Sequence, residues 1–203
     1  MAHITDMDAL RQVYKQPKGR SLSKQITKLE RHSKRYIGLS PFLVLSTTGT
    51  DGLGDATPRG EEPGFVHVLD DNTIAIPDRP GNNRLDSMTN ILSNPGVGLI
   101  FLLPGVNETL RINGTAEIRT DEDLLARFEV NGKLPASVIV VRINEVYLHC
   151  AKALMRSKLW SADAQSDVRP IPTIAEMIKD QAGDDEPLES DADMQARYAK
   201  ILY

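Results

Sequence analysis

The sequence predicts a mainly β fold: a six-stranded antiparallel barrel with helical extensions at both ends of the chain. Three observations lead to this prediction. Short runs of β-type residues follow one another through short, turn-rich links, as in hairpins. Helical segments do not lie between every pair of strands, so a parallel βαβ sheet is not expected. The phosphate-binding motifs GxGxxG and GxxxxGKS/T are absent. This combination is typical of a closed or split antiparallel barrel.

The first half of the chain begins with helical spacing and then turns to strands. Apolar residues recur at helical intervals over residues 7–37, with a break near residues 16–19. The run FLVLST at 42–47 is a β-type segment, closed by the turn-forming TGTDGLGD. Two further strands, joined through Asp-Asp-Asn as a hairpin, are expected at 63–69 and 73–77.

The second half contains one short helix, three strands and a helical end. In the helix over 85–92, Leu85, Met88 and Leu92 share one face, which predicts that this face packs inward. We expect strands at 96–103, at 108–119 with a bend or bulge at Gly114, and at 137–150 with a bend near Asn144. Further helices are expected at 121–130, 152–160, 173–181 and 191–202.

The length of 203 residues suits a single domain over 1–203. We expect a barrel core over about 37–160, an N-terminal helical extension over 1–36 and an acidic C-terminal helical extension over 161–203. The net charge of −4 gives no global footprint for nucleic acid. The two ends differ in charge, since residues 11–35 hold nine Lys or Arg residues and residues 180–193 are acidic. These ends are either two solvated extensions or segments that contact each other, including across a subunit boundary.

Several features predict a cytoplasmic protein. No apolar run approaches the ~20 residues that cross a bilayer, so no membrane partner is expected. The N-terminus lacks the basic-then-apolar layout of a signal peptide. Cys150 is the only cysteine, which excludes an intrachain disulfide and gives no thiolate metal cluster. No metal site is expected.

The stretch PDRPGNNR at 77–84 stands directly before the helix at 85–92. Asn82 or Asn83 can cap the helix, and Gly81 allows a ligand to approach the backbone. Arg79 and Arg84 add fixed positive charge beside first-turn amides that have no partner within the helix. Together these groups predict a phosphate or carboxylate site. The alternative is an ordinary capped helix whose arginines face solvent.

Arg59, in DATPRGEEPGFV, supplies a second basic element. If 63–69 and 73–77 pair as a hairpin, Arg59 lies near the 79–84 loop. Two arginines from separate segments that converge on one spot favour a bound anion. The alternative is an ion pair of Arg59 with Glu61 or Glu62.

Three motifs in order give the chain a family resemblance: Thr57-Pro58-Arg59-Gly60, IPDRPGNNR at 76–84 and HCAKALMRSKLW at 149–160. With the strands around them, they resemble the FMN proteins related to pyridoxamine 5′-phosphate oxidase, over about residues 30–160. The resemblance implies a split β-barrel and a homodimer that binds FMN at the subunit interface.

The resemblance also implies roles for particular residues. The segment that includes Asp78 and Asn82 supplies FMN contacts, and the backbone of Ile76 and Pro77 faces the flavin ring. The phosphate is held by Arg59, Asn83 and Arg84. Arg111 contacts the flavin or its ribityl chain, unless it faces outward and pairs with Glu108 or Glu117.

HCAKALMRSKLW forms the other half of the implied site. Lys152 and Arg156 lie four residues apart on one helical face, with Ser157 and Trp160 next to that stripe. We expect this helix start to cover the flavin of the second subunit, with Trp160 stacked on the flavin or a substrate. The alternative for Trp160 is a partly buried core residue. His67, His149 and Cys150 are expected to be packing or strand-end residues.

The function that follows is an FMN-dependent oxidoreductase acting on a small, unidentified substrate. No acid or base residue is assigned, because the flavin ring itself accepts the hydride. Vitamin B6 oxidase activity is not expected, since the Arg- and His-bearing C-terminal signature is replaced by an acidic tail. One alternative is a non-catalytic protein that binds flavin, haem or a deazaflavin. Another is a domain without a cofactor whose charged ends bind a partner protein.

Overall fold

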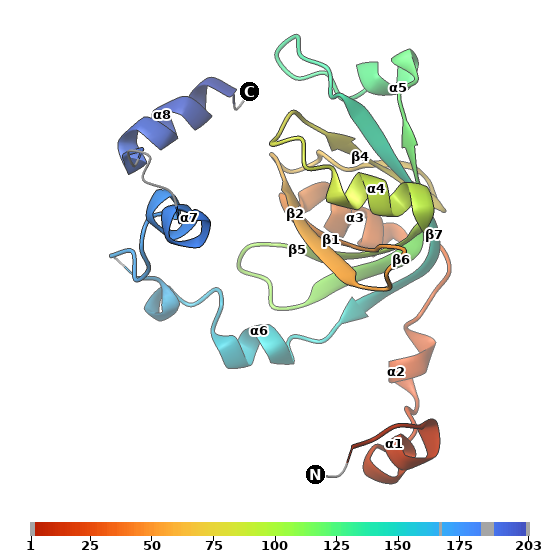
Figure 1. The fold of residues 1–203 in the computed structure, drawn as a ribbon. Coiled ribbons are helices and arrows are strands. Elements are labelled where there is room, and N and C mark those ends of the chain that lie inside the picture. Colours follow the sequence, from red (N-terminus) through yellow and green to blue (C-terminus); the bar gives the residue numbers. More distant parts are fainter. Residues whose placement is uncertain (1–2, 167, 184–188, 202–203) are drawn as a thin grey trace.

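The computed structural model describes residues 3–166, 168–183 and 189–201. Its centre is one antiparallel sheet of seven strands in the order β2-β1-β5-β6-β7-β4-β3 (Figure 1). The strands are β1 (Phe42–Thr48), β2 (Gly54–Gly60), β3 (His67–Asp70), β4 (Thr73–Asp78), β5 (Gly96–Leu102), β6 (Thr109–Arg119) and β7 (Ser137–His149). The prediction of a mainly β, antiparallel fold with added helices is confirmed.

Some helices lie against the sheet, and others belong to the N-terminal and C-terminal parts of the chain. They are α1 (Met7–Val13), α2 (Arg20–Ser23), α3 (Arg31–Leu39), α4 (Asp86–Ser93), α5 (Glu122–Ala126), α6 (Lys152–Ser157), α7 (Ile174–Ala182) and α8 (Asp191–Ile201), with a 3-10 turn at Ala162–Ala164. α3 and α4 pack on the sheet, whereas α1 and the run from α6 to α8 extend away from it (Figure 1). Within the described residues, no helix has the length and apolar character needed to cross a lipid bilayer.

The predicted strand count of six is wrong, because GDATPRG forms the additional strand β2. Its register on β1 runs from Phe42↔Gly60 to Thr48↔Gly54. β2 is an edge strand, where a proline such as Pro58 is tolerated because one side of the strand makes no ladder hydrogen bonds. Its partly buried positions are Asp55, Thr57 and Arg59, so no apolar alternation marks it in the sequence.

The core forms where the inner faces of the strands meet α3 and α4. In β1, Leu43 and Leu45 are fully buried, and their neighbours on either side are more exposed, as strand alternation requires. Ile37 of α3 and Ile91 of α4 close the core from the helical side. Each such side chain stabilises the fold by about 1.5–3 kcal/mol.

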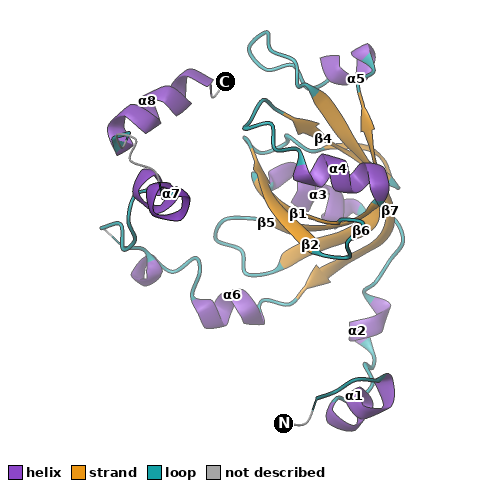
Figure 2. Ribbon diagram, viewed as in Figure 1, coloured by secondary structure: helices purple, strands orange, loops and turns teal. Residues whose placement is uncertain are grey.

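The sheet curls, as Figure 2 shows. Arg59 of β2 forms an ion pair with Asp78 of β4, although four strands separate β2 from β4 in the sheet order. α4 packs on β1, β2 and β6. The space between β2 and the end of β4 is therefore bridged by side chains.

The inward face of α4 differs from the prediction. Met88 is buried as expected, but Leu85 and Leu92 are exposed. The buried face is formed by Ser87, Met88 and Ile91. The helix begins one residue after Leu85, which has the left-handed conformation of an N-terminal flanking residue, so Leu85 does not share the helical periodicity.

The predicted bends in the two long strands coincide in one β-bulge. The register of β6 on β7 passes from Asn113↔Glu145 to Gly114↔Ile143, so Asn144 is the additional residue. A Cβ atom at Gly114 would overlap the carbonyl oxygen of Arg142 and lie 3.1 Å from a methyl group of Val141. The bulge therefore requires glycine at this position.

We expect Gly114→Ala to lower the free energy of unfolding by about 1–3 kcal/mol, because the bulge cannot accept a methyl group without shifting the backbone. The measurement is the urea midpoint followed by circular dichroism. Gly54→Ala is the matched control, because its Cβ meets no atom within 4 Å. Equal midpoints for the two variants would contradict the prediction.

Candidate cofactor site

A cleft of about 600 Å³ opens between β2 and the segment that joins β4 to α4. It is lined by residues 55–59, 78–88 and 136. The sequence-predicted residues Arg59, Asp78, Asn82, Asn83 and Arg84 are thus brought together in one place. The volume falls in the range of about 300–1,000 Å³ that is usual for small-molecule sites.

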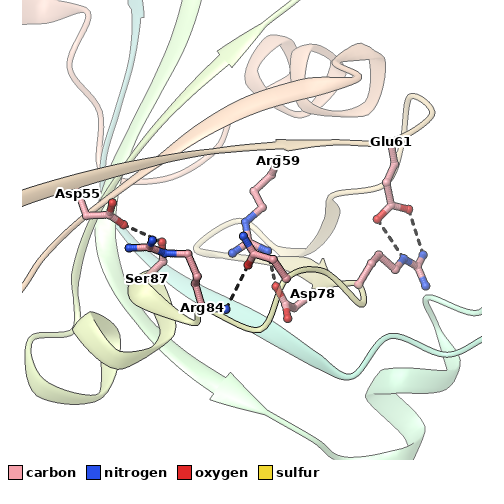
Figure 3. Close-up of polar contacts among 8 residues, drawn as sticks. Asp55, Arg59, Glu61, Asp78, Arg84 and Ser87 are labelled. Carbon is pink, nitrogen blue, oxygen red and sulfur yellow. Dashed lines mark hydrogen bonds and ion pairs between the residues drawn. The ribbon is translucent and has the colours of Figure 1, made fainter. Parts of the chain in front are cut away.

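Arg59 and Asp78 face each other across the cleft (Figure 3). The Arg59 Nη1 donates to the Asp78 carboxylate, and the two side chains are 21% and 15% exposed. Arg59 Nε is buried and has no hydrogen-bond partner. A buried donor without an acceptor is unfavourable by about 1–3 kcal/mol, so this guanidinium can accommodate a further acceptor from the cleft. The alternative partners considered for Arg59, Glu61 and Glu62, do not take this role.

Glu61 instead binds Arg79. Arg79 Nε and Nη2 each donate to one carboxylate oxygen of Glu61 at 3.0 Å, in the two-point geometry that suits a guanidinium and a carboxylate. The side chains of Arg79 and Glu61 are 10% and 15% exposed. Arg79 is therefore largely neutralised and lies in the wall of the cleft.

The start of α4 forms the next part of the cleft wall. The residue before the helix, Leu85, has φ 60° and ψ 21°, and no side chain caps the helix. The predicted capping by Asn82 or Asn83 is wrong: Asn82 Oδ1 accepts a hydrogen bond from Arg84 N, and Asn83 has φ 59°. The first-turn amides of α4 therefore lack a side-chain acceptor and can bind an anion.

Arg84 lies at the mouth of the cleft with its side chain 74% exposed. Its Nε donates to Asp86 Oδ2 at 2.8 Å, and this hydrogen bond raises the pKa of Arg84 above its ordinary value. The group is thus a permanent positive charge beside the α4 amides.

A polar network that the sequence did not reveal fastens α4 to the first two strands. Ser87 Oγ donates to Asp55 Oδ2 at 3.0 Å, and Asn90 Nδ2 donates to Thr47 Oγ1 at 3.0 Å. Asp55 and Ser87 both line the cleft. The available signal was the inward alternation of Asp55, Thr57 and Arg59 once β2 is taken as a strand.

The other predicted contact residues lie elsewhere in their own chain. Ile76 and Pro77 are buried in β4 directly before Asp78. The guanidinium of Arg111 lies over the ring of Tyr147, with its Cζ 5.0 Å from the ring centroid. Lys152, Arg156 and Ser157 are exposed on α6, and Trp160 Nε1 donates to the carbonyl of Val106 at 2.9 Å. None of these side chains lines the cleft of its own chain, and their role at a second subunit stays a prediction.

A second cavity of about 470 Å³ adjoins the cleft, with Arg79 in the walls of both. His67 lies in its lining and stacks on Phe128, with ring centroids 4.0 Å apart. Burial, followed by the positive charge of Arg127, lowers the pKa of His67 below its ordinary value. The expected packing role of His67 agrees with this stacked, half-buried position.

The structure is thus a small, mainly β protein with a curled antiparallel sheet and a polar cleft beside the start of α4. The family model of pyridoxamine 5′-phosphate oxidase matches residues 29–150, which is more than half of the chain. The chain therefore belongs to the pyridoxamine 5′-phosphate oxidase family.

Solved structures with a similar fold were also found. A tagged HupZ protein of Group A Streptococcus is 18% identical, with a TM-score of 0.48, over 59% of this chain and 93% of that chain. A Lactobacillus delbrueckii protein described as a candidate pyridoxamine 5′-phosphate oxidase is 21% identical, with a TM-score of 0.48, over 60% and 95%. An FMN-binding protein of Syntrophomonas wolfei is 12% identical, with a TM-score of 0.43, over 57% and 80%. A comparison with curated protein sequences gave no match.

Because the pKa of His67 is lowered on folding, the unfolded chain binds a proton more readily than the folded chain. We therefore expect the stability that His67 contributes to be present above its ordinary pKa of 6.5 and to be lost as the pH falls below it. The measurement is the urea midpoint at about pH 7.5 and about pH 5.5, for the wild type and for His67→Gln. The variant should lose less stability on acidification than the wild type, and an equal loss would contradict the assignment to His67.

Proposed function

We propose that the chain is an FMN-binding flavoprotein and an FMN-dependent oxidoreductase that acts on a small substrate. The observation that carries the proposal is the buried, unsatisfied Nε of Arg59 in a cleft that also contains the uncapped start of α4. A phosphate group offers the oxygen acceptors that both elements lack. Membership of the pyridoxamine 5′-phosphate oxidase family supports a phosphate-bearing ligand at this place.

The residues present fit the phosphate end of FMN. Arg59 and Arg84 would supply charged donors, and Asn83 and the first-turn amides of α4 would supply neutral ones. Each arginine has an acid partner, Asp78 or Asp86, but a guanidinium has five N–H donors and one contact to a carboxylate leaves others for phosphate. The backbone of Ile76 and Pro77, beside Asp78, would support the ring.

When bound, FMN supplies the hydride- and electron-accepting chemistry at its ring. The chain would orient the ring and hold the phosphate. No catalytic acid or base residue of the chain is assigned.

The proposal includes a homodimer in which the second subunit completes the site. The candidate contributors Arg111, Lys152, Arg156, Ser157 and Trp160 do not line the cleft of their own chain. Under this proposal they would reach the cleft only from another copy of the chain.

The remaining parts of the proposal concern architecture and location. We propose a single domain over 1–203 whose curled sheet is the split barrel of FMN-binding proteins. Cys150 is free and exposed, which suits the reducing conditions of a cytoplasmic location.

A non-catalytic flavin- or deazaflavin-binding role for the same cleft is the second candidate. The lining residues 55–59, 78–88 and 136 include no His, Cys, Tyr or Lys side chain for proton transfer. Reduction of the bound flavin by NADH or NADPH, at a rate above that of free FMN, would decide in favour of the enzyme.

The absorption spectrum of the purified protein with FMN tests the cofactor directly. We expect a flavin spectrum, and we expect Arg59→Ala and Arg84→Ala each to weaken FMN binding by about 10- to 100-fold, because each removes a charge-assisted hydrogen bond to phosphate. Riboflavin, which lacks the phosphate, should bind with similar affinity to wild type and variants. Arg119→Ala is the matched control, since Arg119 is an exposed arginine paired with Glu117 and Asp121 outside the cleft. Unchanged FMN affinity in both cleft variants would refute the phosphate site.

The homodimer predicts a solution mass of twice that of one chain and a complementation result. Arg59→Ala lacks a cleft residue, and Arg156→Ala lacks an exposed α6 residue proposed to act on the partner's site. A mixed dimer of the two variants should regain one intact FMN site, which equilibrium binding of FMN would detect. A monomeric mass, or no gain on mixing, would contradict the shared site.

A further inference from the structure

The pair formed by Glu61 and Arg79 lies where the chain has little regular structure. Glu61 follows the last residue of β2, and Arg79 follows the last residue of β4. Their two-point contact, with both bonds at 3.0 Å and neither side chain more than 15% exposed, joins these strand ends. β2 and β4 are not neighbours in the sheet, so no ladder hydrogen bonds hold these strand ends together.

The segment that Arg79 begins is the one that forms the rim of the cleft. Residues 79–85 have no helix or strand, and Asn83 and Leu85 both have positive φ. At its far end the segment is fixed by the hydrogen bond of Ser87 to Asp55. At its near end the Glu61–Arg79 pair provides the corresponding fastening. The position of Asn83, Arg84 and the α4 amides thus depends on two contacts. One joins Ser87 to Asp55 in β2, and the other joins Arg79 to Glu61, the residue directly after β2.

We propose that Glu61 and Arg79 are positioning residues that hold the 79–84 loop in the conformation that receives the phosphate of the bound flavin. This inference rests on the proposed function and extends it to a pair that does not contact the phosphate. The pair acts through the loop: an unfastened loop has many conformations, and ligand binding must then order it at the expense of affinity.

The sign of the effect distinguishes positioning from simple electrostatics. Glu61→Gln removes one negative charge from the neighbourhood of the phosphate site. On charge alone, this change would strengthen phosphate binding. If the pair positions the loop, the same change weakens binding. The Gln amide offers one acceptor oxygen, and its NH₂ group is a donor, so the two-point contact to the guanidinium cannot form.

The experiment measures Kd for FMN and for riboflavin with the wild type, Glu61→Gln and Arg79→Lys. We expect Kd for FMN to rise about tenfold in each variant, and Kd for riboflavin to change little. Lys keeps the positive charge at position 79 but cannot make the two-point contact. Arg79→Lys therefore tests the geometry of the pair separately from its charge. Asp71→Asn, which breaks the exposed Lys34–Asp71 pair on another part of the surface, is the matched control and should bind FMN as the wild type does.

Limited proteolysis provides a readout that needs no flavin. Trypsin can cut the Arg84–Leu85 bond, whereas the bond after residue 79 precedes Pro80 and resists trypsin in the wild type and in Arg79→Lys. We expect cleavage at Arg84 to be faster in both pair variants and unchanged in Asp71→Asn. Tight FMN binding and wild-type cleavage in Glu61→Gln and Arg79→Lys would overturn the inference. Failure of the wild type to bind FMN would overturn the proposed function instead, and the cleavage rates would still decide whether the pair fastens the loop.

Discussion

The structure depends on how a curled sheet closes its open side without backbone hydrogen bonds. β2 has one strand neighbour, and the end of β4 faces it across a gap bridged by two ion pairs, Arg59–Asp78 and Glu61–Arg79. Removing charges from water is unfavourable, and only good geometry and further hydrogen bonds offset the loss. A gap closed in this way remains polar, so it can admit a ligand that a packed apolar seam would exclude. The cleft is therefore a direct consequence of the mode of closure.

Sequence patterns predicted the parts of the fold that bury apolar surface. The strands around Leu43, Ile76 and Ile139 were found because hydrophobic periodicity reports burial. The bulge was found because Gly114 and Asn144 interrupt two otherwise regular strands, and the structure brings both into the same irregularity. β2 was missed because its inner face carries Asp55, Thr57 and Arg59, which meet a cleft and not the core.

For the candidate site, the sequence predicted which segments lie close together, but it did not predict which side chains form ion pairs. The β3–β4 hairpin correctly places Arg59 near the 79–84 loop. The ion-pair partner of Arg59 could not be predicted, because Glu61 and Glu62 lie next to it in the sequence, whereas Asp78 is 19 residues away. The curvature of the sheet decides which ion pairs form: Arg59 pairs with Asp78, and Arg79 pairs with Glu61. The missing cap of α4 is a similar case, since the residue directly before the helix is the left-handed Leu85, and neither Asn82 nor Asn83 stands at that position.

A chain with a net charge of −4 does not attract anions as a whole, so an anion site in it must be built locally. In this cleft, acidic residues hold the arginines in fixed positions. Asp78 holds one end of the Arg59 guanidinium and leaves Nε within the protein without a partner. A free arginine side chain has many rotamers, and fixing it on ligand binding reduces affinity; an arginine already held by a carboxylate avoids much of this loss. The carboxylates thus reduce the local positive charge, but they also hold the arginine side chains in a fixed conformation before the ligand binds. Under the proposed function, selectivity for a ligand that combines a phosphate with a flat ring would come from the placement of a few donors. The 79–84 loop carries Arg84 and would be the element on which that placement depends most.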